Sequence, residues 1–371
     1  MSKILLFDKG GRKERIKLIK KKKAPKDFFQ SIDYLRSKKF DIEHLTSSIK
    51  YKRNLIYILG GFIEEFFSKI TNVGLRPLQV FYFRKKINSS DIVVSLTDGF
   101  SLSLGFYYAF FDKKNKIKIA GAFHKLSDFD DKLLPIIKTL YFYIFKKILK
   151  RINYIIFYGE ADRLNSIKYF NLQKNKTFNI KFGVDTLFWI PNKKNNYLSK
   201  YIFSIGQDPA RDFQTLLKVK TKKKLHIHTI LLDPFESKNL RITNGRYSSY
   251  KNNFSDVKIR ELYQDAFAVV IPLKDVFQPS GYSVTLQAMA CGKPVVLTKT
   301  KGLWAPKIFK NLKNCILVSP GKPKEIEDSI KILENNKKFY QSICKESRKT
   351  AEKYFSLMEA NKSTLEIFKK F

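Results

Sequence analysis

Short runs of apolar residues alternate with longer amphipathic stretches along most of this chain. Apolar runs of about four to eight residues are typical of buried strands, and apolar positions three and four apart are typical of helices. Such alternation predicts parallel sheets joined by crossover helices. In the first half we expect strands at Lys3–Phe7, Ile92–Leu96, Ile117–Ala122 and Tyr154–Tyr158. Helices are expected at about Lys26–Ser37, Leu55–Lys69, Leu102–Phe111 and Lys132–Lys150.

The second half repeats this pattern after a polar, proline-containing segment, Ile190–Lys200, which we interpret as an inter-domain connection. Expected strands are Tyr201–Ile205, Leu225–Leu231, Ala266–Ile271, Pro294–Leu297 and Cys315–Val318. Expected helices are Phe213–Lys218, Val257–Gln264, Val284–Ala290 and Pro323–Asn335, with two more between residues 337 and 371. A chain of 371 residues is long enough for two domains. The sequence therefore predicts two doubly wound α/β domains that face a cleft, where ligands bind beyond the carboxyl ends of the strands.

Charge is the most informative feature of the composition, because the chain has 72 Lys and Arg residues against 33 Asp and Glu, a net charge of +39. The densest basic run is Arg12–Lys26. Such a surface attracts polyanions, either nucleic acid or anionic lipid headgroups. Arginine, which would read bases, is scarce beside lysine, and the sequence contains no recognised nucleic-acid-binding module, so we expect no specific nucleic-acid partner. A general drift of solvated faces toward lysine is the alternative explanation.

The three cysteines, Cys291, Cys315 and Cys344, have no metal-like spacing and an odd number, which favours a reducing compartment. The apolar run at Ile4–Phe7 is too short for a signal peptide, and no apolar window is long enough for a transmembrane helix. We therefore expect a cytoplasmic protein.

The stretch "SGYSVTLQAMACGKPVV" (residues 280–296) carries the clearest chemical signal. Its apolar positions predict a buried helix, for which Ser280 and Ser283 are suitable N-cap residues, and Gly281 allows a ligand to approach the backbone. Gly292 suits the left-handed position after the helix. The free N–H groups and dipole at the helix start form an anion site worth ~0.3–1 kcal/mol per charge. The alternative is a well-capped helix without a ligand.

This stretch resembles the donor-site segment of family-four retaining glycosyltransferases, which have the two-domain GT-B fold and belong to glycosyl transferases group 1. Three further stretches carry the same resemblance: "FGVDTLFWIP" (182–191), "YIFSIGQDPARDFQTLLK" (201–218) and "DAFAVVIPLKDVFQPSG" (265–281). The resemblance is specific over roughly residues 180–300, whereas the first 180 residues match only in layout. It implies an acceptor-side domain at 1–190, a donor domain at 200–350, and a C-terminal helix at about 351–371 that packs back on the first domain.

The resemblance implies roles for individual residues. Gly206 would lie near the donor pyrophosphate, and Arg211 takes the place of the lysine that neutralises the leaving diphosphate. Residues 280–283 would present backbone N–H groups and hydroxyls to the phosphates and the donor sugar, and Gln287 stands where the family has a glutamate that holds the ribose. The donor-side candidates are therefore Gly206, Gln207, Arg211, Ser280, Gly281, Tyr282, Ser283 and Gln287.

Three positions depart from the family pattern. The first of its paired glutamates is Pro279 here and the second is Gln287, which binds a hydroxyl without charge assistance. The arginine usual after the glycine turn is Gln207, so Arg211 acts alone or with a lysine such as Lys274 or Lys301. These departures leave open a catalytically decayed scaffold that binds polyanions or membranes.

In the first domain, His124 follows a predicted strand, at the place where family members carry a histidine that contacts the transferred sugar. A structural role for this histidine is the alternative. Asp98 also follows a strand and either binds acceptor hydroxyls or caps the next helix. Gly10 and Gly11 are candidates for the acceptor side of the cleft. By contrast, His226 and His228 alternate with apolar residues on a strand, and we interpret them as structural.

The stretch Lys132–Arg151 has one broad apolar face with lysines outside it. It is either a helix that rests on an anionic membrane or a crossover helix that covers the first sheet. Taken together, the sequence predicts a glycosyltransferase that moves a sugar from a nucleotide-diphosphate sugar to a hydroxyl acceptor: a glycan, a lipid-linked intermediate or a small metabolite. The resemblance implies retention of anomeric configuration and no requirement for a metal or cofactor.

Overall fold

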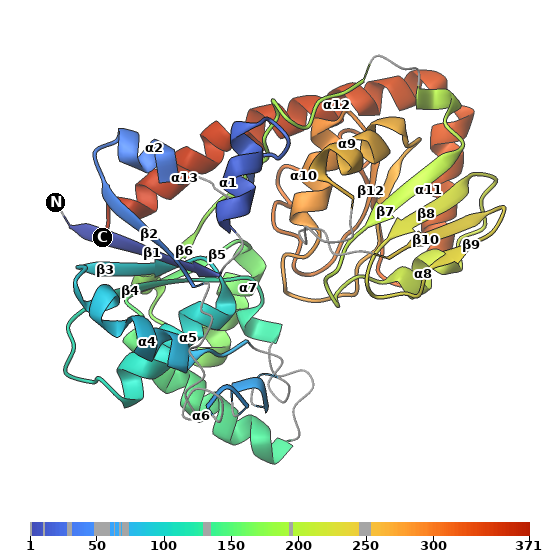
Figure 1. Cartoon of the computed structure of the whole chain (residues 1–371). Helices are drawn as coiled ribbons and strands as arrows, with labels where there is room; N and C mark the ends of the chain where they lie inside the picture. The colour runs from blue at the N-terminus through green and yellow to red at the C-terminus, as the bar shows by residue number, and fades with distance from the viewer. Residues whose placement is uncertain are drawn as a thin grey trace.

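The computed structural model of the protein describes residues 2–9, 12–27, 32–47, 60–62, 64–66, 68, 74–128, 135–192, 196–244 and 254–371. They form two domains, each with a largely parallel sheet between layers of helices (Figure 1). The predicted two-domain α/β fold is thus confirmed. Among the described helices, none combines the length and the apolar character needed to cross a membrane.

The first sheet has six parallel strands in the order β2-β1-β3-β4-β5-β6. Its strands are β1 (Lys3–Lys9), β2 (Asp41–Ser47), β3 (Ile92–Ser95), β4 (Lys118–Phe123), β5 (Tyr154–Phe157) and β6 (Thr177–Asn179). Its helices are α1 (Arg12–Lys20), α2 (Ile32–Ser37), α4 (Pro77–Asn88), α5 (Asp98–Phe110), α6 (Pro135–Arg151) and α7 (Glu160–Phe170).

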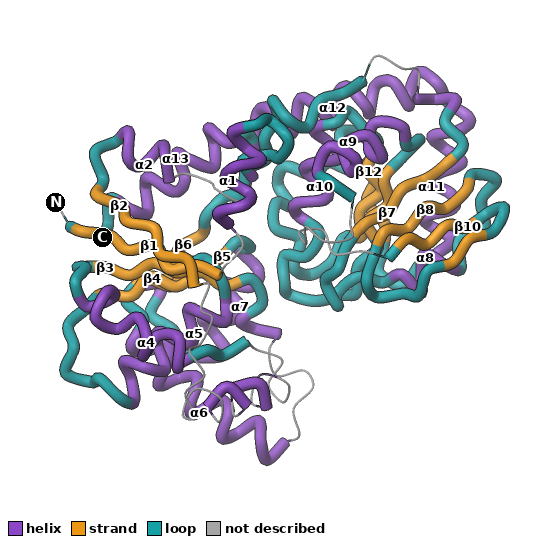
Figure 2. Tube along the Cα trace, viewed as in Figure 1, coloured by secondary structure: helices purple, strands orange, loops and turns teal. Residues whose placement is uncertain are grey.

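Alternation along β1 divides the core of this domain into two layers. Leu5 and Phe7 point toward α4, α5 and α6, whereas Ile4 and Leu6 point toward α2 on the other face. That second layer also contains Ile367 of α13 (Leu357–Phe368), from the end of the chain. Figure 2 shows α2 and α13 on one side of the sheet and α4, α5 and α6 on the other. The C-terminal helix therefore belongs to the packing of the first sheet.

The second sheet has seven strands in the order β13-β12-β11-β7-β8-β10-β9, and only the edge strand β9 runs antiparallel to its neighbour. Its strands are β7 (Tyr201–Ile205), β8 (Lys224–His228), β9 (Phe235–Glu236), β10 (Leu240–Thr243), β11 (Val269–Ile271), β12 (Val295–Thr298) and β13 (Ile316–Val318). Its helices are α8 (Phe213–Leu217), α9 (Asp256–Asp265), α10 (Tyr282–Ala290), α11 (Pro323–Asn335) and α12 (Lys337–Phe355).

Some predicted elements differ from the structure. The predicted strand Leu225–Leu231 ends at His228, where pairing with β10 also ends. Lys26 lies outside any helix, and α2 begins only at Ile32. No pattern in the sequence predicted β2, α1, α4 or α7, because their charged or mixed stretches lack a clear period. His226 and His228 lie buried on β8 as expected, and burial lowers the pKa of each to about 4.

The chain crosses between the domains twice, and the two crossings run side by side. The Val184 N–H donates to the Phe355 carbonyl over 2.7 Å, which pairs the first crossing with the end of α12. Two turns earlier in α12, the Arg348 guanidinium donates to the carbonyls of Thr186, Trp189 and Ala290. A single charged group therefore ties α12 both to the first crossing and to the end of α10.

We expect Arg348→Met to lower the free energy of unfolding by about 2–4 kcal/mol, because it leaves three carbonyls without their charged donor. Urea unfolding measures this change. The control is Lys349→Met on the same helix, whose exposed ammonium meets only Glu346 at 3.4 Å, with an expected change within about 0.5 kcal/mol. Equal effects of the two substitutions would show that Arg348 does not join the crossings.

Candidate active site

Two glycines and one arginine form a tight corner at the carboxyl end of the second sheet. Gly206 follows β7, and Gly281 precedes α10 with φ of 77°, in the left-handed region that favours glycine. A Cβ atom on Gly206 would lie 2.1 Å from the Nε atom of Arg211, and one on Gly281 would lie 3.4 Å from its Nη1 atom. Gly206 must therefore lack a side chain for the guanidinium to lie where it does, whereas at Gly281 the left-handed φ and the Ile271 Cγ2 atom, 2.9 Å from a Cβ, exclude one.

The Arg211 side chain is 6% exposed, and its Nε and Nη1 atoms have no hydrogen-bond partner within the described part of the chain. Burial lowers the pKa of the guanidinium and the nearby Asp208 opposes that shift, yet arginine remains charged in proteins. A buried cation without full hydrogen bonding is costly. The corner is thus electrostatically prepared for an anion beside the N-terminus of α10.

The start of α10 differs from the prediction for Ser280. Gly281, not Ser280, is the N-cap residue, and Ser283 lies inside the helix. The Ser280 hydroxyl instead donates to Asp208 over 3.1 Å, and the Gln278 amide donates to the same carboxylate. Asp208 therefore takes up the Ser280 hydroxyl, which the prediction assigned to phosphates. At the other end of α10, Gly292 has the expected left-handed conformation, with φ of 67°.

Three aromatic rings from the two domains stack on one another. His124 follows β4 and Tyr158 follows β5, and their ring centroids lie 4.4 Å apart. Tyr282, the first residue of α10, lies 6.2 Å from His124 and 6.0 Å from Tyr158, with nearly parallel planes. Tyr282 and His124 were both predicted site residues, and the structure brings them together. Tyr158 was missed as a site residue, although it is the last residue of the predicted strand Tyr154–Tyr158 and so lies near a strand end, as His124 does.

Asp98 fixes the orientation of His124. Its carboxylate accepts from the His124 backbone N–H at 2.9 Å and lies 3.1 Å from Nδ1. Burial alone would raise the pKa of Asp98, but the hydrogen bonds and charge of His124 lower it. Of the two alternatives from sequence, capping is not observed: the side chain bonds to the 124–125 turn rather than to its own helix.

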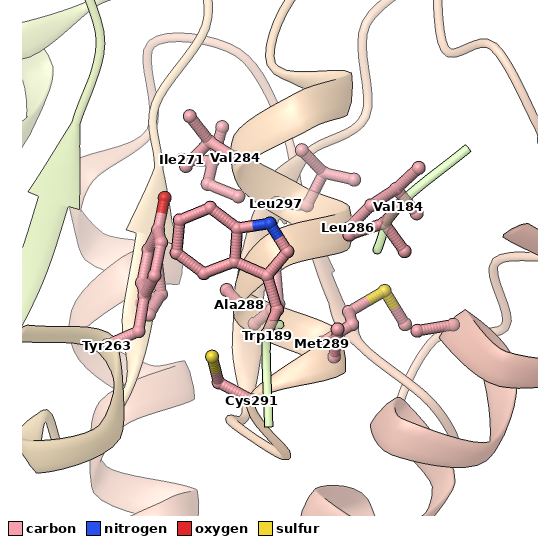
Figure 3. Packing of buried hydrophobic residues seen from close by; sticks show 14 of the residues in the cluster. Val184, Trp189, Tyr263, Ile271, Val284, Leu286, Ala288, Met289, Cys291 and Leu297 are labelled. Carbon is pink, nitrogen blue, oxygen red and sulfur yellow. The ribbon is translucent and has the colours of Figure 1, made fainter. Parts of the chain in front are cut away.

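Gln287 lies in a dry network formed by both domains. Its Nε2 atom donates to Asp27 over 3.0 Å, and the Tyr263 hydroxyl lies 3.4 Å from its Oε1 atom. The Trp189 indole N–H also donates to Asp27, over 2.8 Å. Figure 3 shows Trp189 beside Tyr263 among the buried side chains of α10. No pattern in the sequence indicated that Asp27 would contact Gln287.

A loop of the second domain is held against the first. The backbone N–H groups of Phe277 and Gln278 donate to the Asp128 carboxylate, and Pro279 packs on Gly159 at the start of α7. Pro279, where the family pattern has a glutamate, thus contributes to contact between the domains.

The other predicted residues lie as follows. Gln207 follows Gly206 and is half-buried. The Lys274 ammonium donates to the Pro209 carbonyl, and that of Lys301 lies over the Phe277 ring, so the contacts of both lysines lie in the loops beside the corner. Gly10 and Gly11 lie outside the described residues.

Comparison with known proteins supports the assignment of the fold. Residues 247–350 match the family model described as glycosyl transferases group 1. An uncharacterized glycosyltransferase of Methanocaldococcus jannaschii is 32% identical over 111 residues; the match covers 30% of this chain and only 27% of that relative.

Solved structures match over the full length of the chain. HepE of Anabaena in complex with UDP-glucose has a TM-score of 0.66 at 14% identity, with 100% of both chains covered. Sucrose-phosphate synthase of Thermosynechococcus elongatus has a TM-score of 0.67 at 12% identity, with 100% of this chain and 99% of that chain covered. The chain thus has the GT-B fold of these glycosyltransferases, and the resemblance to glycosyl transferases group 1 is confirmed.

Near His124 lies a buried carboxylate that sequence patterns did not reveal. Asp162 of α7 accepts from the backbone N–H and hydroxyl of Ser127, while its Oδ2 atom has no hydrogen-bond partner in the described part of the chain. Burial, opposed by the Ser127 hydrogen bonds and assisted by Asp98 and Asp128, raises the pKa of Asp162 to about 7.

Because the pKa of Asp162 is higher in the folded protein than the usual 3.8, its contribution to stability is present below pH 4 and is lost as the pH rises through 7. We expect Asp162→Asn to reduce this fall and to raise the free energy of unfolding at pH 8 by about 1–3 kcal/mol. Urea unfolding at pH 5 and pH 8 tests this. Asp33→Asn on α2, where the side chain is fully exposed, is the control. Parallel pH dependence in wild type and Asp162→Asn would refute the assignment.

Proposed function

We propose that this protein transfers a sugar from a nucleotide-diphosphate sugar to a hydroxyl acceptor. The observation that carries the proposal is the buried, under-bonded Arg211 guanidinium between Gly206 and the start of α10. The group 1 match includes α10, and solved structures with this fold are named as complexes with UDP and UDP-glucose.

The geometry suits departure of a diphosphate. When the bond between the sugar and the diphosphate breaks, negative charge grows on the phosphate oxygens. The fixed Arg211 charge and the free N–H groups of α10 stabilise that charge more than they stabilise the bound ground state. For the phosphates to take the Ser280 hydroxyl, the Asp208 carboxylate must turn away from it.

His124 provides a polar group on the opposite wall, oriented by Asp98 and stacked on Tyr158. In this proposal its ring contacts the transferred sugar, and Tyr282 contributes to the same wall from the second domain. The acceptor is a glycan, a lipid-linked intermediate or a small metabolite that enters from the first domain. By the resemblance, we infer that configuration is retained, that no metal or cofactor is needed and that the reaction takes place in the cytoplasm. Within the described residues, no group of three His, Cys, Asp or Glu side chains is arranged to hold a metal ion.

The alternative from a different class is a decayed GT-B scaffold that retains only binding. It draws on Pro279 and Gln287, which both make contacts with the first domain in this structure. The two functions differ in a simple respect, since only a working donor site requires Arg211 for turnover.

We expect UDP, GDP or ADP to raise the melting temperature of the wild type, and Arg211→Ala to abolish that rise because the phosphates lose their buried cation. Turnover with the matching nucleotide sugar should fall roughly 10²–10³-fold. Gly206→Ala provides an independent variant, because its Cβ atom would push the guanidinium aside without removing it. Chromatographic assay of released nucleotide measures the turnover of both variants.

Arg241→Ala is the matched control, because this exposed arginine pairs with Glu236 on the far edge of the second sheet. Its turnover should equal that of the wild type. Near-normal rates for Arg211→Ala would remove it from the site, and indifference of the wild type to all three nucleotides would favour the decayed scaffold.

We propose in addition that the protein docks on an anionic membrane through the α4–α6 face. This face is defined by exposed side chains of α4, of the segment after α5 and of α6: Phe81, Tyr82, Phe111, Leu140 and Tyr143. The buried Tyr141 and Phe145 show that α6 also covers the sheet, so both interpretations of the Lys132–Arg151 stretch have support.

Charge favours an anionic partner for this face. Residues 77–88, 111–118 and 135–151 contain twelve Lys and Arg residues and one acidic residue, Asp112. Phe111 is 71% exposed, Leu140 is 61% exposed and Tyr143 is 68% exposed. A lysine near an anionic bilayer contributes about 1 kcal/mol, and aromatic and leucine side chains insert at the headgroup boundary. A lipid-linked acceptor would be reached from such a surface.

We expect the protein to sediment with phosphatidylglycerol-containing vesicles and not with pure phosphatidylcholine. The double variant Leu140→Gln/Tyr143→Gln should weaken this binding roughly tenfold by removing two inserted side chains. Leu198→Gln/Met358→Gln removes two other exposed apolar side chains and serves as control. Equal binding by both double variants would exclude the α4–α6 face, and displacement by RNA would point to general polyanion attraction.

A further inference from the structure

The N-terminal segment 12–27 leaves the first sheet and reaches the second domain. Figure 1 shows α1 at the boundary between the domains, near α10. From α1, the Arg15 guanidinium lies 3.1 Å from the Asp256 carboxylate at the start of α9, with side chains only 8% and 7% exposed. This buried ion pair anchors the segment on the donor domain.

At the end of the segment, Asp27 is 1% exposed and accepts hydrogen bonds from the crossing segment and from the second domain. Its Oδ1 atom accepts from the Asp185 N–H at 2.6 Å, and its Oδ2 atom accepts from Trp189 and Gln287. Within the described residues no lysine or arginine forms an ion pair with it. Burial, opposed by these hydrogen bonds, raises the pKa of Asp27 to about 6, which shows that the carboxylate is costly to keep ionised here.

The buried surroundings of Asp27 and those of Arg211 share one residue, Tyr263. Tyr263 interacts electrostatically with both groups: Arg211 lowers its pKa and Asp27 raises it, within a large rise that is due first to burial. The same tyrosine hydroxyl contacts Gln287. Asp27 and Tyr263 therefore contact the two polar ends of the Gln287 amide. Tyr263 also interacts with Arg211, where the diphosphate is proposed to bind.

We propose that Asp27 holds the place of the donor ribose hydroxyls on Gln287, so that the nucleotide binds only when the segment ending in Asp27 moves away. This inference rests on the proposed function, because the resemblance assigns Gln287 to the ribose. A hydroxyl reaches the Gln287 Nε2 atom only after the Asp27 carboxylate leaves it. The carboxylate regains hydration on leaving, and the negative charge of the diphosphate repels it. Asp27 thus sets donor affinity as a positioning residue.

Removal of Asp27 separates this role from a direct grip on the donor. If the segment is released in only a fraction of the molecules, the apparent Kd equals the intrinsic Kd divided by that fraction. We expect Asp27→Ala to lower the Kd for the best of UDP, GDP and ADP roughly fivefold or more. Calorimetric titration of the full-length protein measures this. Inorganic pyrophosphate, which has no ribose, should show a much smaller change.

Two further variants support the test. Arg15→Gln loosens the anchor far from Gln287 and should also tighten nucleotide binding, so the inference remains testable if Asp27→Ala folds poorly. Asp33→Ala, at an exposed position on α2, should leave the Kd unchanged.

The outcomes distinguish this inference from the proposed function. If the wild type binds a nucleotide and Asp27→Ala binds it equally or more weakly, Asp27 is not a competitor and this inference alone is overturned. If neither protein binds any of the three nucleotides, the proposed function fails and the inference fails with it. Binding by Asp27→Ala alone supports both.

Discussion

The structure of the candidate site depends on one physical constraint, the burial of the Arg211 guanidinium between two glycines. A permanent charge that is 94% removed from solvent and short of hydrogen-bond partners requires either a nearby anion or a strong local scaffold. The Gly206 turn and the start of α10 supply that scaffold, because the guanidinium leaves no room for a side chain at Gly206 and the left-handed backbone of Gly281 lies beside it. The corner is therefore a buried, positively charged site at the carboxyl end of the second sheet.

Carboxylates of the protein itself accept hydrogen bonds from the polar groups around this corner. Asp208 takes the Ser280 hydroxyl, Asp27 takes the Gln287 amide, and Asp128 takes the N–H groups of the loop before α10. Two of these three acids come from the first domain, so the same contacts that fill the site also hold the domains together. Under the proposed function, ligand binding and domain contact would compete for the same donors, which would physically link the two.

Much of the fold and part of the site followed from residue patterns. Apolar runs placed most strands of both sheets within a few residues, because a buried strand needs a continuous apolar stretch. The position of His124 beside a strand end and that of Gly281 at a helix start also followed from pattern, since parallel strands deliver their carboxyl ends to one edge, whereas Gly206 and Arg211 were indicated by the family resemblance. Elements with mixed or charged patterns, such as β2 and α1, were missed because their stability comes from neighbours rather than from their own period.

The α/β architecture and the glycine turns could be predicted from the sequence alone, since they depend on local pattern and on side-chain size, and the family resemblance indicated Arg211 as the cation at the corner. Only the tertiary structure decided which acids are buried and what they contact. Asp98 orients His124 instead of capping its helix, Ser280 bonds to Asp208 instead of the helix start, and Asp27 reaches Gln287 across 260 positions of sequence. Such contacts are set by how two domains pack, and local periodicity carries no information about that packing.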